Sequence, residues 1–162
     1  HLDDKVKRHG KVKLTTKSGS QVLVLTPNNK NRGDNLLGLG QMLDARELRG
    51  RTLSVSARLA ASKDVTAIVG VHVLGGGDQF IQFRQENSEG NFRTHQDQFE
   101  VPTGAKNIIV YAIVSGQKGH AWFDDLILGP ASEIDTVSNS KASTNTELNV
   151  RIVVQPQRTP WC

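Results

Sequence analysis

Apolar and polar side chains alternate with a period of two along most of the chain. The clearest example is residues 52–60, where Leu53, Val55, Ala57 and Leu59 alternate with Thr, Ser and Arg. This period predicts β-strands with one face in a core and the other in solvent. Strands are predicted at residues 11–16, 21–26, 36–43, 52–60, 65–74, 79–85, 92–101, 107–114, 119–129 and 147–154.

The segments between these strands are rich in Gly, Pro, Asn and Ser, which predicts turns. The sequence Lys-Ser-Gly-Ser at residues 17–20 joins the first two strands and predicts a β-hairpin. Many short strands with no helical period indicate an all-β protein, a sandwich of two antiparallel sheets. We predict one binding domain over residues 1–130. Residues 131–162 form a Ser/Thr/Asn-rich linker and a terminal strand, which either completes the same sheet or begins another domain.

Residues 119–129 form an apolar, aromatic strand with two adjacent carboxylates, Asp124 and Asp125. Successive side chains of a strand point to opposite faces, so one of these carboxylates is expected to face inward. A buried carboxylate needs a hydrogen-bond, ion-pair or metal partner. Trp122 lies in the same apolar strand and is predicted to pack in the core, the alternative being a platform for a sugar ring.

The composition excludes several classes of protein. The net charge of +4 is concentrated in Lys and Arg of the first seventeen residues, without the interleaved aromatic residues of a single-strand nucleic-acid platform. We therefore expect no nucleic-acid partner. No apolar stretch approaches the ~20 residues of a membrane span. The single cysteine, Cys162, excludes an internal disulfide framework but does not determine the compartment.

Several short motifs follow one another along the chain in the order and spacing found in a known group of proteins. They are LGQMLDA at residues 39–45, LRGRTLSVSAR at 48–58, FEVPTGA at 99–105 and AWFDDL at 121–126. Together they resemble the galactose-binding-domain-like jelly-roll carbohydrate-binding modules, which bacterial polysaccharide-degrading enzymes and surface proteins carry as appended domains. The resemblance implies a jelly roll that binds a polysaccharide or oligosaccharide without catalysis. It also implies a secreted protein, outside a bacterial cell or on its surface.

The resemblance further implies a structural calcium ion held by an aspartate of the last core strand, here Asp124 or Asp125. In this group a Gly-Asp-Phe-Glu-like opening segment supplies further ligands, whereas this chain has Leu-Asp-Asp-Lys at residues 2–5. Calcium prefers six to eight oxygen ligands. The alternative is that the aspartate accepts hydrogen bonds from turn amides or pairs with Lys or Arg.

The outward positions of the central strands combine aromatic, amide and cationic groups, which suit sugar rings and hydroxyl groups. The residues predicted to bind the sugar are His72, Gln82, Arg84, His95 and Tyr111. Ser54, Ser56 and Arg58 are expected beside them. The alternative is an ordinary solvated sheet face.

Catalysis has little support, because the five histidines lie on separate segments and no Gly-x-Ser-x-Gly elbow is present. A copper enzyme that uses His1 is a minor alternative. The second hypothesis, ahead of the copper enzyme, is a protein-interaction or assembly module that docks a partner through an unpaired sheet edge or through its loops.

Overall fold

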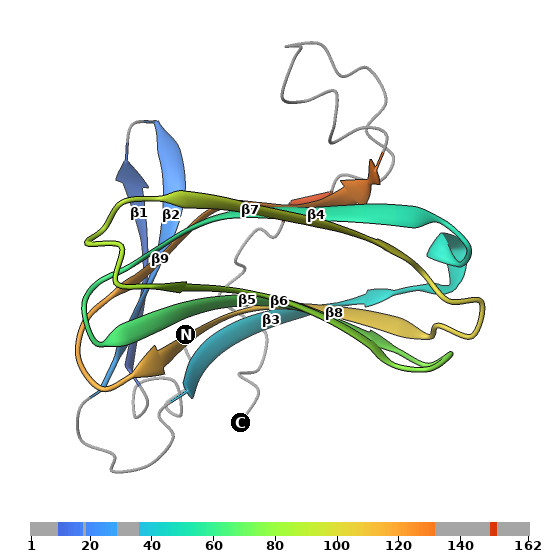
Figure 1. The fold of residues 1–162 in the computed structure, drawn as a ribbon, viewed down its shortest axis with the longest axis horizontal. Coiled ribbons are helices and arrows are strands. Elements are labelled where there is room, and N and C mark those ends of the chain that lie inside the picture. Colours follow the sequence, from blue (N-terminus) through green and yellow to red (C-terminus); the bar gives the residue numbers. More distant parts are fainter. Residues whose placement is uncertain (1–9, 18, 29–35, 132–149, 152–162) are drawn as a thin grey trace.

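The computed structural model describes residues 10–17, 19–28, 36–131 and 150–151 of the 162. They form two β-sheets packed face to face (Figure 1). The strands are β1 (Gly10–Lys17), β2 (Ser20–Pro27), β3 (Leu36–Asp44), β4 (Thr52–Ala61), β5 (Val65–Leu74), β6 (Gln79–Glu86), β7 (Arg93–Glu100), β8 (Asn107–Gly116), β9 (Ala121–Pro130) and β10 (Val150–Arg151). One 3-10 turn, Arg46–Leu48, follows β3.

Every strand pair is antiparallel. The six-stranded sheet has the order β1-β2-β9-β4-β7, with β10 also paired to β9, and the four-stranded sheet has the order β3-β8-β5-β6. The chain crosses from one sheet to the other between β2 and β3, β3 and β4, β4 and β5, β6 and β7, β7 and β8, and β8 and β9. The prediction of an all-β sandwich with two antiparallel sheets, a jelly roll, is therefore confirmed.

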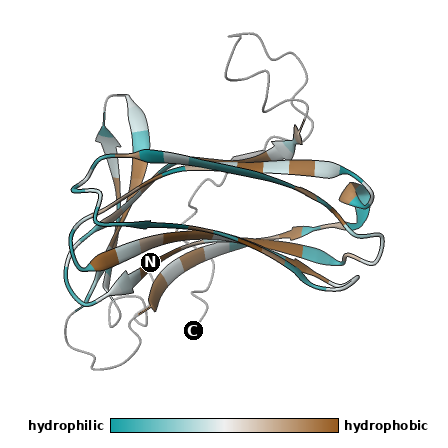
Figure 2. Ribbon diagram, in the orientation of Figure 1, coloured by the Kyte–Doolittle hydropathy of each residue, from teal (hydrophilic) through white to brown (hydrophobic). Residues whose placement is uncertain are grey.

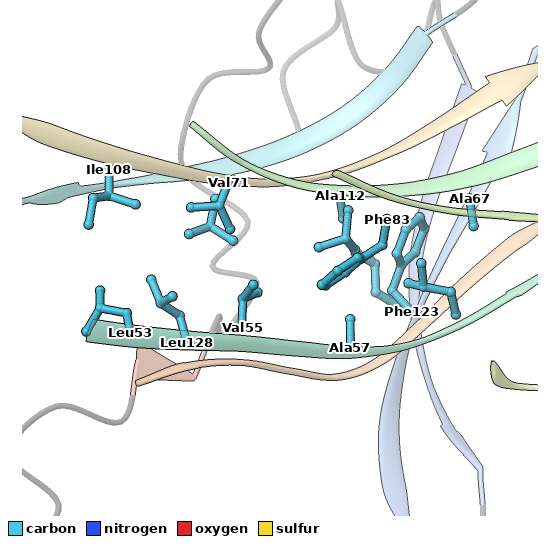
Figure 3. Close-up of a cluster of buried hydrophobic side chains, with 14 of the residues drawn as sticks. Leu53, Val55, Ala57, Ala67, Val71, Phe83, Ile108, Ala112, Phe123 and Leu128 are labelled. Atoms are coloured by element: carbon cyan, nitrogen blue, oxygen red, sulfur yellow. The ribbon is translucent and has the colours of Figure 1, made fainter. Parts of the chain in front are cut away.

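The core lies between the two sheets and is built by the period-two pattern. Leu53, Val55 and Leu128 of the six-stranded sheet face Val71 and Ile108 of the four-stranded sheet (Figure 3), and each is at most 2% exposed. Figure 2 shows the same pattern as hydrophobic bands along the strands, with hydrophilic turns between them. The inward half of each strand is thus used for packing, which leaves the outer faces of the two sheets for other roles.

The predicted strand positions agree closely with the structure. The hairpin of β1 and β2 is confirmed, and β5 has the predicted bounds, residues 65–74. Of the predicted last strand at residues 147–154, the described part is Val150–Arg151, which pairs with Leu128 and Ile127 of β9. The division of the chain near residue 130 remains a prediction.

Candidate functional site

Four of the five predicted sugar-binding residues lie together on the outer face of the four-stranded sheet. Their strand register places Tyr111 of β8 beside Gly70 of β5, which is beside Gln82 of β6. The adjacent row runs from Ile109 through His72 to Phe80. We call the surface formed by His72, Phe80, Gln82, Arg84 and Tyr111 the aromatic face.

Tyr111 lies flat on the sheet because its neighbour is a glycine. A Cβ atom at Gly70 would lie 2.0 Å from Tyr111 Cζ and 2.1 Å from its Oη, so no larger residue fits beneath this ring position. Burial raises the pKa of the Tyr111 hydroxyl, and a side-chain hydrogen bond with Gln82 acts in the opposite direction. The ring therefore presents a broad face to solvent while its hydroxyl is already oriented.

Phe80 extends this platform and is the most exposed large apolar residue of the described chain, at 55%. Its ring stacks on Tyr111 with centroids 6.1 Å apart and an interplanar angle of 28°. His72 meets Phe80 edge to face, with centroids 5.7 Å apart. Three rings from three adjacent strands thus form one cluster, an arrangement typical of stable aromatic contacts.

The polar groups of the face lie beside the rings. Gln82 and Arg84 are both exposed on β6, and Arg84 is level with Ile68 of β5 and Ile113 of β8. Among the described residues, none forms an ion pair with Arg84. The face therefore offers an amide and a guanidinium next to an aromatic platform, so it can contact both the apolar and the hydroxyl edges of a sugar ring.

Phe80 was not among the predicted ligand residues, although the alternation along residues 79–85 places it on the same side as Gln82 and Arg84. Leu36 and Met42 of β3 were also missed. They are 52% and 45% exposed on the same outer face. Large exposed apolar side chains at outward strand positions were the available signal.

The prediction that His95 belongs to this surface is wrong. His95 pairs with Ala57, whose side chain is in the core, so it points between the sheets from the edge strand β7. Its ring stacks on Phe83 at 5.6 Å, and its Nε2 lies 3.2 Å from Gln85 Oε1. Burial lowers the pKa of this imidazole. Its role here is packing along the open edge of the sandwich.

Ser54, Ser56 and Arg58 also lie away from the aromatic face, because β4 belongs to the six-stranded sheet. The outer face of that sheet also carries Trp122, which is half-buried next to Val24 and Ala60 rather than in the core. The prediction of core packing for Trp122 is wrong, because its neighbour Phe123 takes the inward position. Trp122 instead contacts the His120 ring, with centroids 5.7 Å apart.

Neither carboxylate of β9 points into the core, so the expected alternation is wrong at this point. The register between β4 and β9 shifts between Ser56 and Arg58, where a β-bulge places two β9 residues opposite one β4 residue. Asp125, with φ of 47°, lies at this bulge. Asp124 is on the outer face of the six-stranded sheet, opposite Arg58.

Asp124 is only 6% exposed, but protein groups satisfy its carboxylate. Arg58 Nη1 donates to its Oδ2 at 3.1 Å, and the Asp125 amide donates to its Oδ1 at 2.9 Å. Desolvation, followed by the nearby charge of Asp125, raises the pKa of Asp124.

Arg58 also lies 5.0 Å over the Phe92 ring, and the Lys17 ammonium is 5.5 Å from the same ring. We call the surface formed by Lys17, Arg58, Phe92, Trp122 and Asp124 the charged face.

These contacts do not fit a calcium site built from Asp124 and Asp125 alone, because Arg58 Nη1 lies 3.1 Å from Asp124 Oδ2 and 3.6 Å from Asp125 Oδ2. Across the described ranges, no group of three or more His, Cys, Asp or Glu residues could hold a metal ion. The opening segment at residues 2–5, and His1 of the copper alternative, lie outside the described residues. Structural calcium remains a prediction.

Solved structures of other proteins share this architecture. One is TmCBM61, solved in complex with beta-1,4-galactotriose, with a TM-score of 0.55, 15% identity and coverage of 79% of this chain and 84% of that chain. Another is the C-terminal family 22 carbohydrate binding module of Clostridium thermocellum Xyn10B, with a TM-score of 0.53, 17% identity, and coverage of 75% and 82%. The fold is that of the jelly-roll carbohydrate-binding modules. The predicted resemblance in fold is therefore confirmed.

A third similar structure is the enzymatically active domain of tailspike protein 4 of bacteriophage CBA120, with a TM-score of 0.56 and 19% identity. The match covers 75% of this chain but 18% of the tailspike chain. No family model and no curated protein matches the sequence. At these identities the similarity establishes the jelly-roll fold and leaves the ligand to be argued from the residues. In the part of the chain that the structure describes, no helix has the length and apolar character needed to cross a membrane.

Proposed function

We propose that this jelly roll is a non-catalytic module that binds a polysaccharide or oligosaccharide on its aromatic face. The observation that carries the proposal is the exposed ring cluster of Phe80, Tyr111 and His72, next to Gln82 and Arg84. The fold shared with carbohydrate-binding modules supports it.

The two kinds of group on this face have different roles in binding a sugar. The C–H face of a pyranose ring packs on the Phe80 and Tyr111 rings, which removes apolar surface from water. Gln82, Arg84 and His72 hydrogen-bond to ring hydroxyls at the edge of the platform. Because the platform extends over adjacent strands, we expect a chain of sugars to bind better than a single residue.

The positions of the carboxylates on this outer face argue against hydrolysis of a bound glycan. Glycoside cleavage commonly needs two carboxyl groups about 5 to 10 Å apart on either side of the bond. On the described outer face of the four-stranded sheet, the carboxylates are Asp44 at the end of β3 and Glu86 at the end of β6, which the register places at opposite corners. Asp44 is paired with Arg46, and Glu86 accepts a hydrogen bond from Thr66. We expect no release of reducing sugar from any bound polymer.

Binding is tested by affinity electrophoresis and a glycan array, followed by titration calorimetry with the best ligand. Phe80→Ala removes the most exposed ring and should weaken binding about tenfold or more, from the apolar area that it no longer buries. Arg84→Ala and Tyr111→Ala should also weaken it. Leu14→Ala is the matched control, because Leu14 is an exposed large apolar residue of β1 (46%) on the other sheet. Binding that is unchanged in Phe80→Ala and Tyr111→Ala would exclude this face.

We also propose that the module is part of a larger bacterial protein and acts outside the cell or on its surface, where polysaccharides are accessible. Fractionation of the source cells with an antibody against this domain tests the location, and the size of the detected band tests the larger protein. Exclusive recovery in the cytoplasmic fraction would contradict the location.

A further inference from the structure

The outer face of the four-stranded sheet is chemically divided into two halves. The first half, on β5 and β6 together with Tyr111 of β8, carries the exposed aromatic and hydrogen-bonding groups of the aromatic face. The half on β3 and β8 carries Leu36 and Met42, which are exposed, and Ile109 and Ile113, which are half-buried. Three of the four exposed large hydrophobic residues in the described chain, Leu36, Met42 and Phe80, lie on this one outer face.

The aliphatic half is flat for the same reason as the aromatic half. A Cβ atom at Gly38 would lie 2.6 Å from Ile113 Cγ1, so the Ile113 side chain occupies the space above the glycine. Between Leu36 and Met42 the outward positions of β3 are Gly38 and Gly40, so this stretch has no side chain that can donate or accept a hydrogen bond. A sugar hydroxyl placed over this stretch would lose water without gaining a side-chain partner from β3.

The charge on this surface is also low. Within its central rows, between the corner carboxylates Asp44 and Glu86, the one charged side chain is Arg84. The opposite sheet has Lys11, Lys13 and Lys17 on β1 alone. The charge on this outer face therefore does not favour a highly anionic polymer. A neutral polymer that carries apolar groups can contact both the aromatic face and the aliphatic half of the sheet.

We infer that the ligand of this face is a neutral glycan whose sugars carry O-acetyl groups, each of which ends in a methyl group. The sugar ring packs on Phe80 and Tyr111, and the substituents point across β8 toward the aliphatic patch of Leu36, Met42, Ile109 and Ile113. This inference rests on the proposed function and specifies which polysaccharides that function selects. Each methyl group buried on the patch should tighten binding about fourfold.

The test uses neutral polysaccharides in matched pairs, each in its native acetylated form and after mild alkaline deacetylation, which leaves the backbone intact. We expect the acetylated form to bind at least about fourfold more tightly. Met42→Gln and Ile113→Thr should abolish this preference while leaving affinity for the deacetylated form within about twofold. Leu14→Gln on the other sheet is the matched control and should keep the preference. Circular dichroism and thermal unfolding verify that each variant is folded.

The two proposals fail in different ways. Equal or tighter binding of the deacetylated polymer, with Phe80→Ala still weakening it, would overturn the substituent preference and leave the proposed function standing. Absence of binding to every polymer would overturn both. A dimer in solution that dissociates in Met42→Gln, with no glycan bound, would show that the patch contacts a second copy of the chain and would also overturn both.

Discussion

The outer faces of the two sheets differ in how their polar groups are used. On the charged face, Arg58 pairs with the nearly buried Asp124 and covers the Phe92 ring, so the cation, the anion and the aromatic group satisfy one another. On the aromatic face, Arg84 has no ion pair among the described residues, and Phe80 remains 55% exposed. Residue types alone do not define a binding surface, because both faces contain arginine and aromatic rings. What differs is whether these groups are already engaged.

The largest expected effect separates the two arginines. Arg58→Met keeps an apolar stem near Phe92 but leaves the Asp124 carboxylate, 6% exposed, without its cation. We expect a loss of about 2 kcal/mol in the free energy of unfolding, below the usual cost for a fully buried pair because Arg58 itself is 42% exposed. Arg84→Met should change stability by less than about 0.5 kcal/mol. Urea denaturation measures both, and equal losses would remove the distinction between the faces.

The next effect concerns the glycine beneath Tyr111. Gly70→Ala places a Cβ atom where the ring now lies, so the ring must swing away from the sheet. We expect glycan binding to weaken about tenfold. The control is a double-mutant cycle, because Gly70→Ala should have no further effect in a Tyr111→Ala background. Additive losses in calorimetric titrations would show that Gly70 does not act through the ring.

A smaller effect is the opposite direction in which the pKa values of Asp44 and Asp124 are shifted. Hydrogen bonds from Arg46 lower the pKa of the exposed Asp44 to about 2, whereas desolvation raises the pKa of Asp124. Asp44 therefore contributes stability above its ordinary pKa of 3.8, and this is lost as the pH falls toward about 2. Asp124 has the opposite sign, because protonation as the pH falls through its raised pKa relieves the cost of a buried charge. Carbon-detected NMR titration of the carboxyl groups checks the order, and a lower midpoint for Asp124 than for Asp44 would contradict it.

The smallest expected effect is that of His95→Ala on glycan binding. His72→Ala removes a ring that contacts Phe80 and should weaken glycan binding several-fold, whereas His95→Ala should leave it unchanged within about twofold. Both variants are compared by affinity electrophoresis on one gel. A loss of binding in His95→Ala as large as that in His72→Ala would extend the site to the edge between the sheets.

The alternation of apolar and polar residues was enough to predict most strands, because turn residues clearly mark the strand ends. It predicted β5 without error, and it placed Phe80, Gln82 and Arg84 on one side of β6. It could not predict that β8 lies beside β5, since that pairing joins residues about forty positions apart. The contact of Tyr111 with Gly70, and therefore the flat platform, depends on this long-range register.

The errors have local causes. β7 is polar on both sides, so its pattern gave no inward face, yet Phe99 pairs with Leu53 in the core and His95 has the same parity. In β9 the bulge at Asp125 interrupts the alternation, and periodicity contains no signal for an extra residue. Trp122 and Phe123 are adjacent aromatic residues, and only the pairing with β2 and β4 determined which one faces inward.

The position of Tyr111 above Gly70 also has a consequence for the thermodynamics and kinetics of binding. A ring that the sheet holds in place before a ligand arrives loses little rotational freedom on association, so more of the contact energy appears as affinity. No rearrangement need precede the encounter, which favours fast association and fast exchange between neighbouring repeats of a polymer. Under the proposed function, the module remains on a polysaccharide by rebinding along the chain while each single contact is brief.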